Sequence, residues 1–347
     1  MKRKLLACLV LLCLLLTGCA GTTVIYQEMP RPDEPQTDPT PDTNSGGAVK
    51  TGLSIVTDIS DSQSTVEADY DVTVVAVTVD DEGVIRQCII DGISAKVPFD
   101  TTGTITGDIT SPVQTKNELG EDYGMKKYGG ARYEWYEQAA ALANYAVGKT
   151  AEQLRSGAID ETGYAADADL VTSATIYLGG LVSAIEEAAA RARHMGASAD
   201  DELRLAVIAD LSDSSSATGD AEGRARLGCD VAALTLAGDI ITSCRIDSVQ
   251  ADVPFDAMGT ITGELSRDVK TKTELGEDYG MKHYGGAKYE WYEQAAAFAD
   301  YATGKTAEEV MGIAVSDGKP TQPDLTTSVT ISITPFQALI AKACGVR

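Results

Sequence analysis

An internal duplication constrains the fold of this chain more than any other feature. Residues 115–141 read TKNELGEDYGMKKYGGARYEWYEQAAA, and residues 271–297 repeat this stretch with three differences, so that 24 of 27 positions are identical. The segment VPFD at 97–100 recurs at 253–256. Because the copies are separated by the length of a small domain, the sequence predicts a tandem duplication rather than a solenoid.

Each copy shows strand patterns first and helix patterns afterwards. Apolar and polar residues alternate over 70–79, and a second β-rich run follows over 84–93. The second copy has the same pair over 230–236 and 240–246. Helical spacing then appears over 133–147. This order predicts an α+β fold with two tandem repeats, each a small antiparallel sheet with packed helices.

The charge of the chain excludes several classes of partner. The formal net charge is -24 over 347 residues, whereas the 44% hydrophobic content is ordinary for a globular protein. Nucleic acids and anionic lipid surfaces both favour basic proteins. We therefore expect no nucleic-acid binding, and a solvated acidic surface.

The N-terminus predicts a lipoprotein. Residues 2–4 are basic, residues 5–16 form an apolar run suited to a signal peptide, and the run ends in LTGC at 16–19. This ending resembles the lipobox of bacterial lipoproteins, which implies removal of residues 1–18 and lipidation of Cys19. The expected location is the extracytoplasmic face of the bacterial cell membrane, with residues 19–49 as a disordered, Pro- and Asp-rich tether. The mature formal charge becomes -24 - 3 = -27.

The remaining residues offer no obvious catalytic or metal set. The four cysteines that lie beyond Cys19 have no CxxC spacing, and the two histidines of the chain lie away from them. This pattern favours single buried thiols over a zinc site or a redox dithiol. No catalytic residue and no metal ligand is predicted.

A hydroxyl-rich motif precedes the last helix pattern of each copy. The first is DLVTSAT at 169–175, and the second is DLTTSVT at 324–330. We expect each motif to lie at the start of a helix, where free backbone N–H groups and small residues can bind a phosphate. The alternative is that the hydroxyls only cap the helix.

The motif resembles the Asp-x-x-Ser/Thr-Gly-Ala-Thr signature of FMN-binding domains, the family of the flavin subunits of the Rnf and Nqr complexes. In that family a flavin transferase joins FMN to the last threonine through its phosphate. The resemblance implies an FMN anchor at Thr175, with Asp169, Thr172, Ser173 and Ala174 before it. In the second copy it implies Thr330, with Asp324, Thr327 and Ser328. The loop beside the flavin ring would contain Glu118, Leu119 and Gly120, and its copy Glu274, Leu275 and Gly276.

An aromatic block provides a second argument for a planar ligand. Both tryptophans of the chain, Trp135 and Trp291, lie in the duplicated block among several tyrosines. Aromatic side chains stack on flat rings, and tyrosine hydroxyls can bind ring carbonyls. The alternative is that these side chains are simply the core of a small domain.

The resemblance implies a membrane-anchored FMN-binding lipoprotein with two domains, at 50–195 and 203–347. Such a protein is an electron carrier or binding protein rather than a turnover enzyme, with a flavin transferase and redox proteins as partners. The family's glycine is replaced by Ser173 and Ser328, and its alanine by Val329, a β-branched residue expected to crowd the site. These departures support the alternative, a non-redox binding or structural lipoprotein without the cofactor. A third hypothesis is that the cleaved signal peptide acts as a peptide signal.

Overall fold

A computed structural model describes residues 47–63 and 66–346 of the chain. The predicted signal peptide, Cys19 and most of the predicted tether lie outside these residues. Within the described part, none of the helices combines the length and the hydropathy needed to cross a bilayer. All described residues belong to one compact unit.

Two antiparallel sheets form the centre of this unit. The first sheet has the strand order β3-β2-β1-β4, and the second has the order β5-β6-β7. A short hairpin forms a third sheet from β8 and β9. The strands are β1 (Ala48–Asp58), β2 (Glu67–Val79), β3 (Ile85–Pro98), β4 (Arg193–Ser198), β5 (Glu202–Asp210), β6 (Gly223–Ala237), β7 (Ile240–Phe255), β8 (Val315–Ser316) and β9 (Lys319–Pro320).

The helices follow the strands in each half of the chain. The first half has α1 (Lys116–Leu119), the 3-10 helix η1 (Gly120–Tyr123), α2 (Met125–Gly129), α3 (Trp135–Ala146), α4 (Ala151–Ala158), α5 (Ala168–Ser173) and α6 (Gly179–Ala190). The second half has α7 (Lys272–Leu275), η2 (Gly276–Tyr279), α8 (Met281–Gly285), α9 (Trp291–Ala302), α10 (Ala307–Met311), α11 (Pro323–Thr326) and α12 (Thr334–Cys344). The predicted α+β class with small antiparallel sheets is confirmed.

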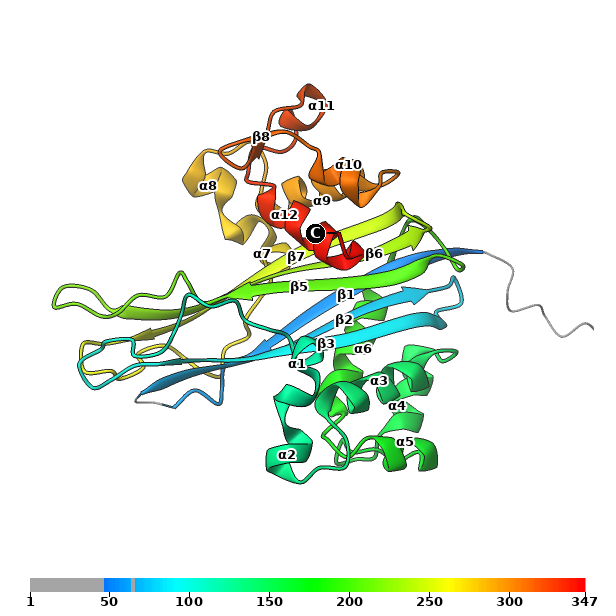
Figure 1. The fold of residues 1–347 in the computed structure, drawn as a ribbon, viewed down its shortest axis with the longest axis horizontal. Helices are drawn as coiled ribbons and strands as arrows, with labels where there is room; N and C mark the ends of the chain where they lie inside the picture. Colours follow the sequence, from blue (N-terminus) through cyan, green and yellow to red (C-terminus); the bar gives the residue numbers. More distant parts are fainter. Residues whose placement is uncertain (1–46, 64–65, 347) are drawn as a thin grey trace, which may run out of the picture. The chain divides into compact units, whose positions relative to one another are not determined.

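Both faces of each sheet are covered. Along β2, Val72 and Val74 belong to the core between the two sheets, whereas Val75 and Val77 belong to the core beneath the helices. Successive strand side chains point to opposite faces, so β2 must be apolar on both. Figure 1 shows α3 and α6 on the outer side of the first sheet, and α9 and α12 on the outer side of the second.

The two sheets pack face to face and join the two copies. Phe99 and Phe255, which occupy equivalent positions in the copies, stack with ring centroids 4.0 Å apart. At the other end of the interface, the buried hydroxyls of Thr51 and Ser243 form a hydrogen bond of 2.7 Å. One apolar core therefore contains residues from both halves of the chain.

All four cysteines of the described residues are free thiols. Cys229 and Cys244 are buried, and Cys88 and Cys344 are half-buried. Burial raises the pKa of Cys88 to about 12 and that of Cys244 to about 12. Because the thiolate is the reactive form, these side chains behave as apolar packing groups at neutral pH.

Candidate functional site

The first hydroxyl motif lies between two helices rather than at the start of one. Asp169 to Ser173 form most of the short helix α5, and α6 begins only at Gly179. The expectation that the whole motif opens the last helix is therefore wrong. Ser and Thr near a helix end can bond to preceding carbonyls. Here these bonds accompany the end of α5 at Ser173. Residues 174–178, which we call the threonine loop, connect α5 to α6.

The motif's side chains fall into two groups. Thr172 Oγ1 and Ser173 Oγ donate to the carbonyl of Asp169, at 2.8 and 3.1 Å, so both hydroxyls close the helix. Ala174 is buried in the core. Thr172 and Thr175 are both exposed. The Thr172 hydroxyl bonds the backbone of its own helix, whereas the Thr175 hydroxyl follows the helix and bonds only the side chain of Gln138, at 3.2 Å.

The amide of Gln138 holds the threonine loop in place. Its Oε1 accepts hydrogen bonds from the backbone N–H of Thr175 at 2.7 Å, from the Thr175 hydroxyl at 3.2 Å and from the N–H of Ile176 at 3.1 Å. Its Nε2 donates to the carbonyl of Tyr133 at 3.0 Å. Gln138 is fully buried, so these bonds satisfy its amide.

The second copy repeats this arrangement with Gln294. Its Oε1 accepts from the Thr330 N–H at 2.8 Å, from the Thr330 hydroxyl at 3.1 Å and from the Ile331 N–H at 3.2 Å. Sequence reasoning missed both glutamines. The available signal was a polar residue, identical in both copies, on the apolar face of a helix three positions after the tryptophan.

A cleft of about 440 Å³ lies beside the threonine loop of the first copy. We call it the Trp135 cleft. Trp135 and Gln138 are three residues apart on α3, so one helix positions both the aromatic wall and the loop anchor. The cleft is lined by Val56, Asp58, Asp61, Asp71, Thr73, Lys116, Trp135, Ile176, Tyr177, Gly180 and Leu181.

A lysine forms the cationic part of the cleft. Lys116 is 4% exposed, its Nζ lies 2.7 Å from Asp71, and it stands 5.0 Å from the centroid of the Trp135 ring. Gly92 provides the space, since a Cβ there would lie 3.3 Å from Lys116 Cδ and 3.5 Å from Trp135 Cη2. The cleft also contains Asp58 and Asp61, so three carboxylates accompany one lysine and the formal charge of its lining is 1 - 3 = -2.

The start of α6 adds hydrogen-bond donors to the cleft. No side chain caps this 12-residue helix. Within the described residues, the backbone N–H groups of Gly180 and Leu181 have no hydrogen-bond partner. A helix start with free N–H groups and small residues suits an anion. Gly180 and Leu181 line the same cleft as Trp135.

The second copy is closed at the corresponding place. Phe336, at the position of Leu181, is buried and meets Trp291 edge to face with centroids 5.8 Å apart. Pro335, at the position of Gly180, has no N–H to offer. In the first sheet Asp71 lies opposite Ser94, and in the second sheet Gly228 lies opposite Gln250. Ser94 and Gln250 are equivalent positions of the two copies, so Gly228 occupies the place of the aspartate that pairs with Lys116.

The remaining motif residues of the second copy lie on or just after α11. Asp324 is an exposed residue of α11, and Thr327 follows its last residue. Ser328 Oγ donates to the Leu325 carbonyl at 3.3 Å. Val329 is 1% exposed within the core, so it does not crowd the approach to Thr330 as expected from its branched side chain.

The loop expected beside a flavin ring has another position. Glu118 and Leu119 are the last two residues of α1, and Gly120 starts η1; Glu274, Leu275 and Gly276 repeat this in α7 and η2. Glu118 accepts from the Thr115 N–H and pairs with Lys342 of the other copy at 2.6 Å. Glu274 pairs with Arg191. These carboxylates serve helix starts and the contact between the copies, and none of the six residues lines the Trp135 cleft.

Two buried glutamates of the duplicated block have a structural role. The buried carboxylate of Glu134 accepts from the N–H groups of Met125 and Lys126, at 2.7 and 3.0 Å. Glu290 does the same with Met281 and Lys282. Each carboxylate thus fixes the short helix that precedes it. Tyr128, a tyrosine of the same block, is 77% exposed and is therefore not a core residue.

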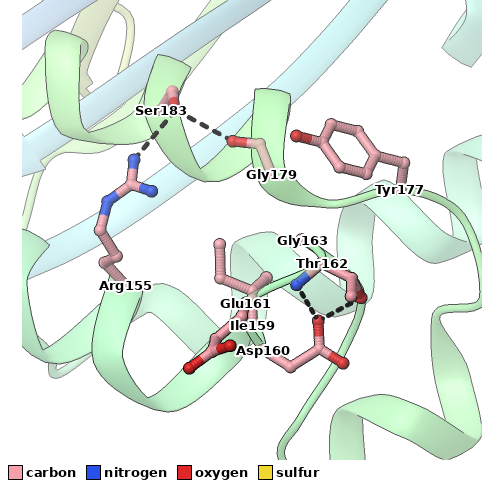
Figure 2. Close-up of a pocket in the computed structure, with 9 residues that line it drawn as sticks. All are labelled: Arg155, Ile159, Asp160, Glu161, Thr162, Gly163, Tyr177, Gly179 and Ser183. Atoms are coloured by element: carbon pink, nitrogen blue, oxygen red, sulfur yellow. Dashed lines mark hydrogen bonds between the residues drawn. The ribbon is translucent and has the colours of Figure 1, made fainter.

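A second cavity of about 440 Å³ shares Tyr177 of the threonine loop with the Trp135 cleft. Figure 2 shows the residues that line it. Arg155 on α4 donates to Ser183 on α6 at 2.9 Å and pairs with Glu186. The turn at Asp160 faces this pair, with Thr162 Oγ1 donating to Asp160 at 2.6 Å. No tryptophan lines this cavity, so it lacks the indole side chain that the Trp135 cleft has.

Comparison with protein-family models, with curated proteins and with solved structures found no match for this chain.

Proposed function

We propose that this chain is a membrane-anchored, extracytoplasmic FMN-binding lipoprotein whose first repeat holds the flavin. The observation that carries the proposal is that the exposed Thr175 directly precedes Ile176, which lines the cleft together with Trp135. The lipobox ending at Cys19 supports the location. The duplication supports a common origin of the two sites, of which the second is filled by Phe336.

The residues of the Trp135 cleft fit the parts of FMN. The side chain of Trp135, which is 7% exposed, lines the cleft, and aromatic side chains stack on planar rings. Lys116 and the free N–H groups at the start of α6 offer positive charge and donors for a phosphate or a ring carbonyl. The volume of about 440 Å³ lies within the range of small-molecule sites. FMN, when bound, supplies a ring that accepts and passes electrons.

The chain's own contribution is positioning. Gln138 fixes the Thr175 backbone, which leaves the side chain at the protein surface. Attachment would exchange the Oγ1–H bond for a bond from Oγ1 to the FMN phosphorus, while the P–O bond that joins this phosphorus to the nucleoside monophosphate of a flavin dinucleotide donor breaks and the released monophosphate takes the proton. The Thr175 hydroxyl must first release its 3.2 Å bond to Gln138, a cost of about 1 kcal/mol for a neutral hydrogen bond.

Covalent attachment is tested by co-expression with a flavin transferase. We expect one flavin per chain by intact mass and in-gel fluorescence in the wild type and in Thr330→Val, and none in Thr175→Val. A wild-type chain without flavin would overturn the covalent proposal. Loss of flavin in Thr330→Val alone would move the site to the second repeat.

Reversible binding is tested separately with Trp291→Phe. This variant leaves Trp135 as the only tryptophan of the chain. Added FMN is expected to quench its fluorescence, with saturation. The same titration of Trp135→Phe, which retains only Trp291, is the matched control and should show little saturable quenching.

The second candidate function is a non-redox binding or structural lipoprotein that lacks the cofactor. The observation that favours it is the Gln138 amide, which already accepts the hydrogen bonds that Thr175 and Ile176 could give a phosphate. A colourless protein whose tryptophan fluorescence does not respond to FMN supports this alternative.

The membrane anchor has its own experiment. Wild-type protein is expected to incorporate a labelled fatty acid and to lose residues 1–18, whereas Cys19→Ser should stay unlabelled and keep its signal sequence. Cys88→Ser, which changes a thiol within the folded part, is the control. Absence of the label from wild type contradicts lipidation.

A further inference from the structure

A cavity of about 220 Å³ lies where the two copies meet and contains three arginines. We call it the arginine pocket. Arg191 follows α6, Arg193 begins β4, and Arg245 lies on β7. The other residues of its lining are Leu53, Ile246, Asp247, Thr273 and Glu274. Three arginines at one place are unusual for a chain with 28 basic and 52 acidic residues.

Two of the three positive charges have no acidic partner. Arg191 pairs with Glu187 and Glu274. Among the described residues, no carboxylate oxygen lies within 4.0 Å of the guanidinium of Arg193 or Arg245. Arg245 donates only to the backbone carbonyls of Arg191 and Thr51. Burial, together with the nearby charge of Arg193, lowers the pKa of Arg245.

The two acidic residues of the lining are already engaged. Asp247 accepts from the Ser248 N–H at 2.8 Å, from the Thr271 hydroxyl at 2.8 Å and from the Thr273 N–H at 3.1 Å. Glu274 caps α7 by accepting from the Thr271 N–H at 2.7 Å and pairs with Arg191. The charge of Asp247 acts on Arg245 from a distance, but neither carboxylate forms an ion pair with Arg193 or Arg245.

The fold itself does not require an arginine at position 245. The equivalent residue of the first copy is Ile89, since Cys-Ile-Ile-Asp at 88–91 aligns with Cys-Arg-Ile-Asp at 244–247. Ile89 packs against the core between the sheets. Placing a guanidinium where an isoleucine suffices costs desolvation energy unless a counter-ion compensates it.

We propose that the arginine pocket binds a small oxyanion of the phosphate class at the junction of the two repeats. Guanidinium groups form paired hydrogen bonds with phosphate oxygens, and Arg193 and Arg245 are free to do so. The ligand is inorganic phosphate or a small phosphate monoester. The site is independent of the Trp135 cleft and of flavin.

The test is calorimetric titration of the soluble chain from residue 20 onward, with inorganic phosphate and with glycerol 3-phosphate at constant ionic strength. We expect saturable binding of one anion per chain. Binding of both probes, or of glycerol 3-phosphate alone, identifies a site for a monoester, and binding of inorganic phosphate alone identifies a site for the free ion. Absence of saturable binding of either probe overturns the proposal.

Variants assign the binding to the pocket. Arg245→Ile, which installs the residue of the first copy, and Arg193→Gln are each expected to weaken binding by roughly tenfold or more. Arg193 is exposed and makes no side-chain hydrogen bond to another described residue, so its variant should fold even if Arg245→Ile does not. Arg204→Gln, at an exposed pair with Glu202, is the control. Equal affinity of wild type and Arg193→Gln would contradict the assignment.

Discussion

The side-chain oxygen of Gln138 lies 2.7 Å from the backbone nitrogen of Thr175, although the two residues are 37 positions apart in the sequence. This bond connects α3, which carries Trp135, to the loop that presents the threonine. The same bond recurs at 2.8 Å between Gln294 and Thr330. The threonine loop therefore depends on a buried amide rather than on the start of a helix.

Replacement of Gln138 by leucine should destabilise the protein and release the threonine loop. The N–H groups of Thr175 and Ile176 would lose their acceptor, and the Tyr133 carbonyl its donor. We expect a loss of about 2 kcal/mol or more in the free energy of unfolding, measured in urea. Gln114→Leu, at an exposed position, is the control and should stay within about 0.5 kcal/mol of wild type. Unchanged stability of Gln138→Leu would show that water replaces the amide.

Installing in the Trp135 cleft the residue that closes the second copy should weaken flavin binding. Leu181→Phe installs the side chain that closes the second copy against Trp291. In the Trp291→Phe background, we expect it to weaken FMN quenching of Trp135 by roughly tenfold or more, while overpacking costs about 1–3 kcal/mol. Quenching identical to the parent would place the flavin outside the Trp135 cleft.

The reciprocal variant, Phe336→Leu, should open the second copy. Removing a buried ring that contacts both Trp291 and Phe298 is expected to cost about 1–2 kcal/mol. A shift of the Trp291 emission maximum to longer wavelength in the Trp135→Phe background checks that water has entered. No emission shift would mean that neighbouring side chains collapse into the space.

The duplication and the strand patterns predicted much of the fold, because both depend on local sequence. Alternation over 70–79 predicted β2, which spans Glu67–Val79 in the structure. The packing of the two sheets was not predictable in this way. The apolar inner face of β2 indicates burial but does not say that the partner is the equivalent sheet of the second copy.

The site was predicted only in part. Thr175 and Trp135 were singled out from the motif and the aromatic block, and they lie on the two elements that border one cleft. Gln138 and Lys116 were missed, because a buried polar residue in a helix has no distinctive spacing of its own. The helix start was misplaced since the hydroxyls of Thr172 and Ser173 bond backward to Asp169.

The stability of the protein should depend on pH through Lys272. Burial lowers the pKa of Lys272, and among the described residues no carboxylate oxygen lies within 4.0 Å of its Nζ. Its ammonium stands 4.9 Å from the Trp291 centroid. Between the lowered pKa and the ordinary value of about 10.5, the unfolded chain binds more protons than the folded one. The contribution of Lys272 therefore becomes more favourable as pH rises through this window.

Comparison with Lys272→Met isolates this effect. We expect the free energy of unfolding of wild type to increase relative to that of Lys272→Met between neutral pH and about pH 10. Lys270→Met, which removes an exposed lysine nearby, is the control for the loss of one positive charge. A wild-type advantage that falls with rising pH would mean that the folded state stabilises the ammonium of Lys272.

The stacked pair Phe99 and Phe255 should couple the two copies during unfolding. The rings are nearly parallel, at 4° and 4.0 Å, and each belongs to the core that both sheets share. Truncation of either ring to leucine leaves the other without its stacking partner. In a double-mutant cycle of Phe99→Leu and Phe255→Leu, we expect a coupling energy of about 0.5–1.5 kcal/mol, measured by urea unfolding.

Phe298 lies in the separate core beneath the helices of the second sheet, so the effects of Phe99→Leu and Phe298→Leu on the free energy of unfolding should be additive. Additive effects of Phe99 and Phe255, or separate transitions for Trp135 and Trp291 fluorescence, would show that the repeats unfold independently in spite of their common core.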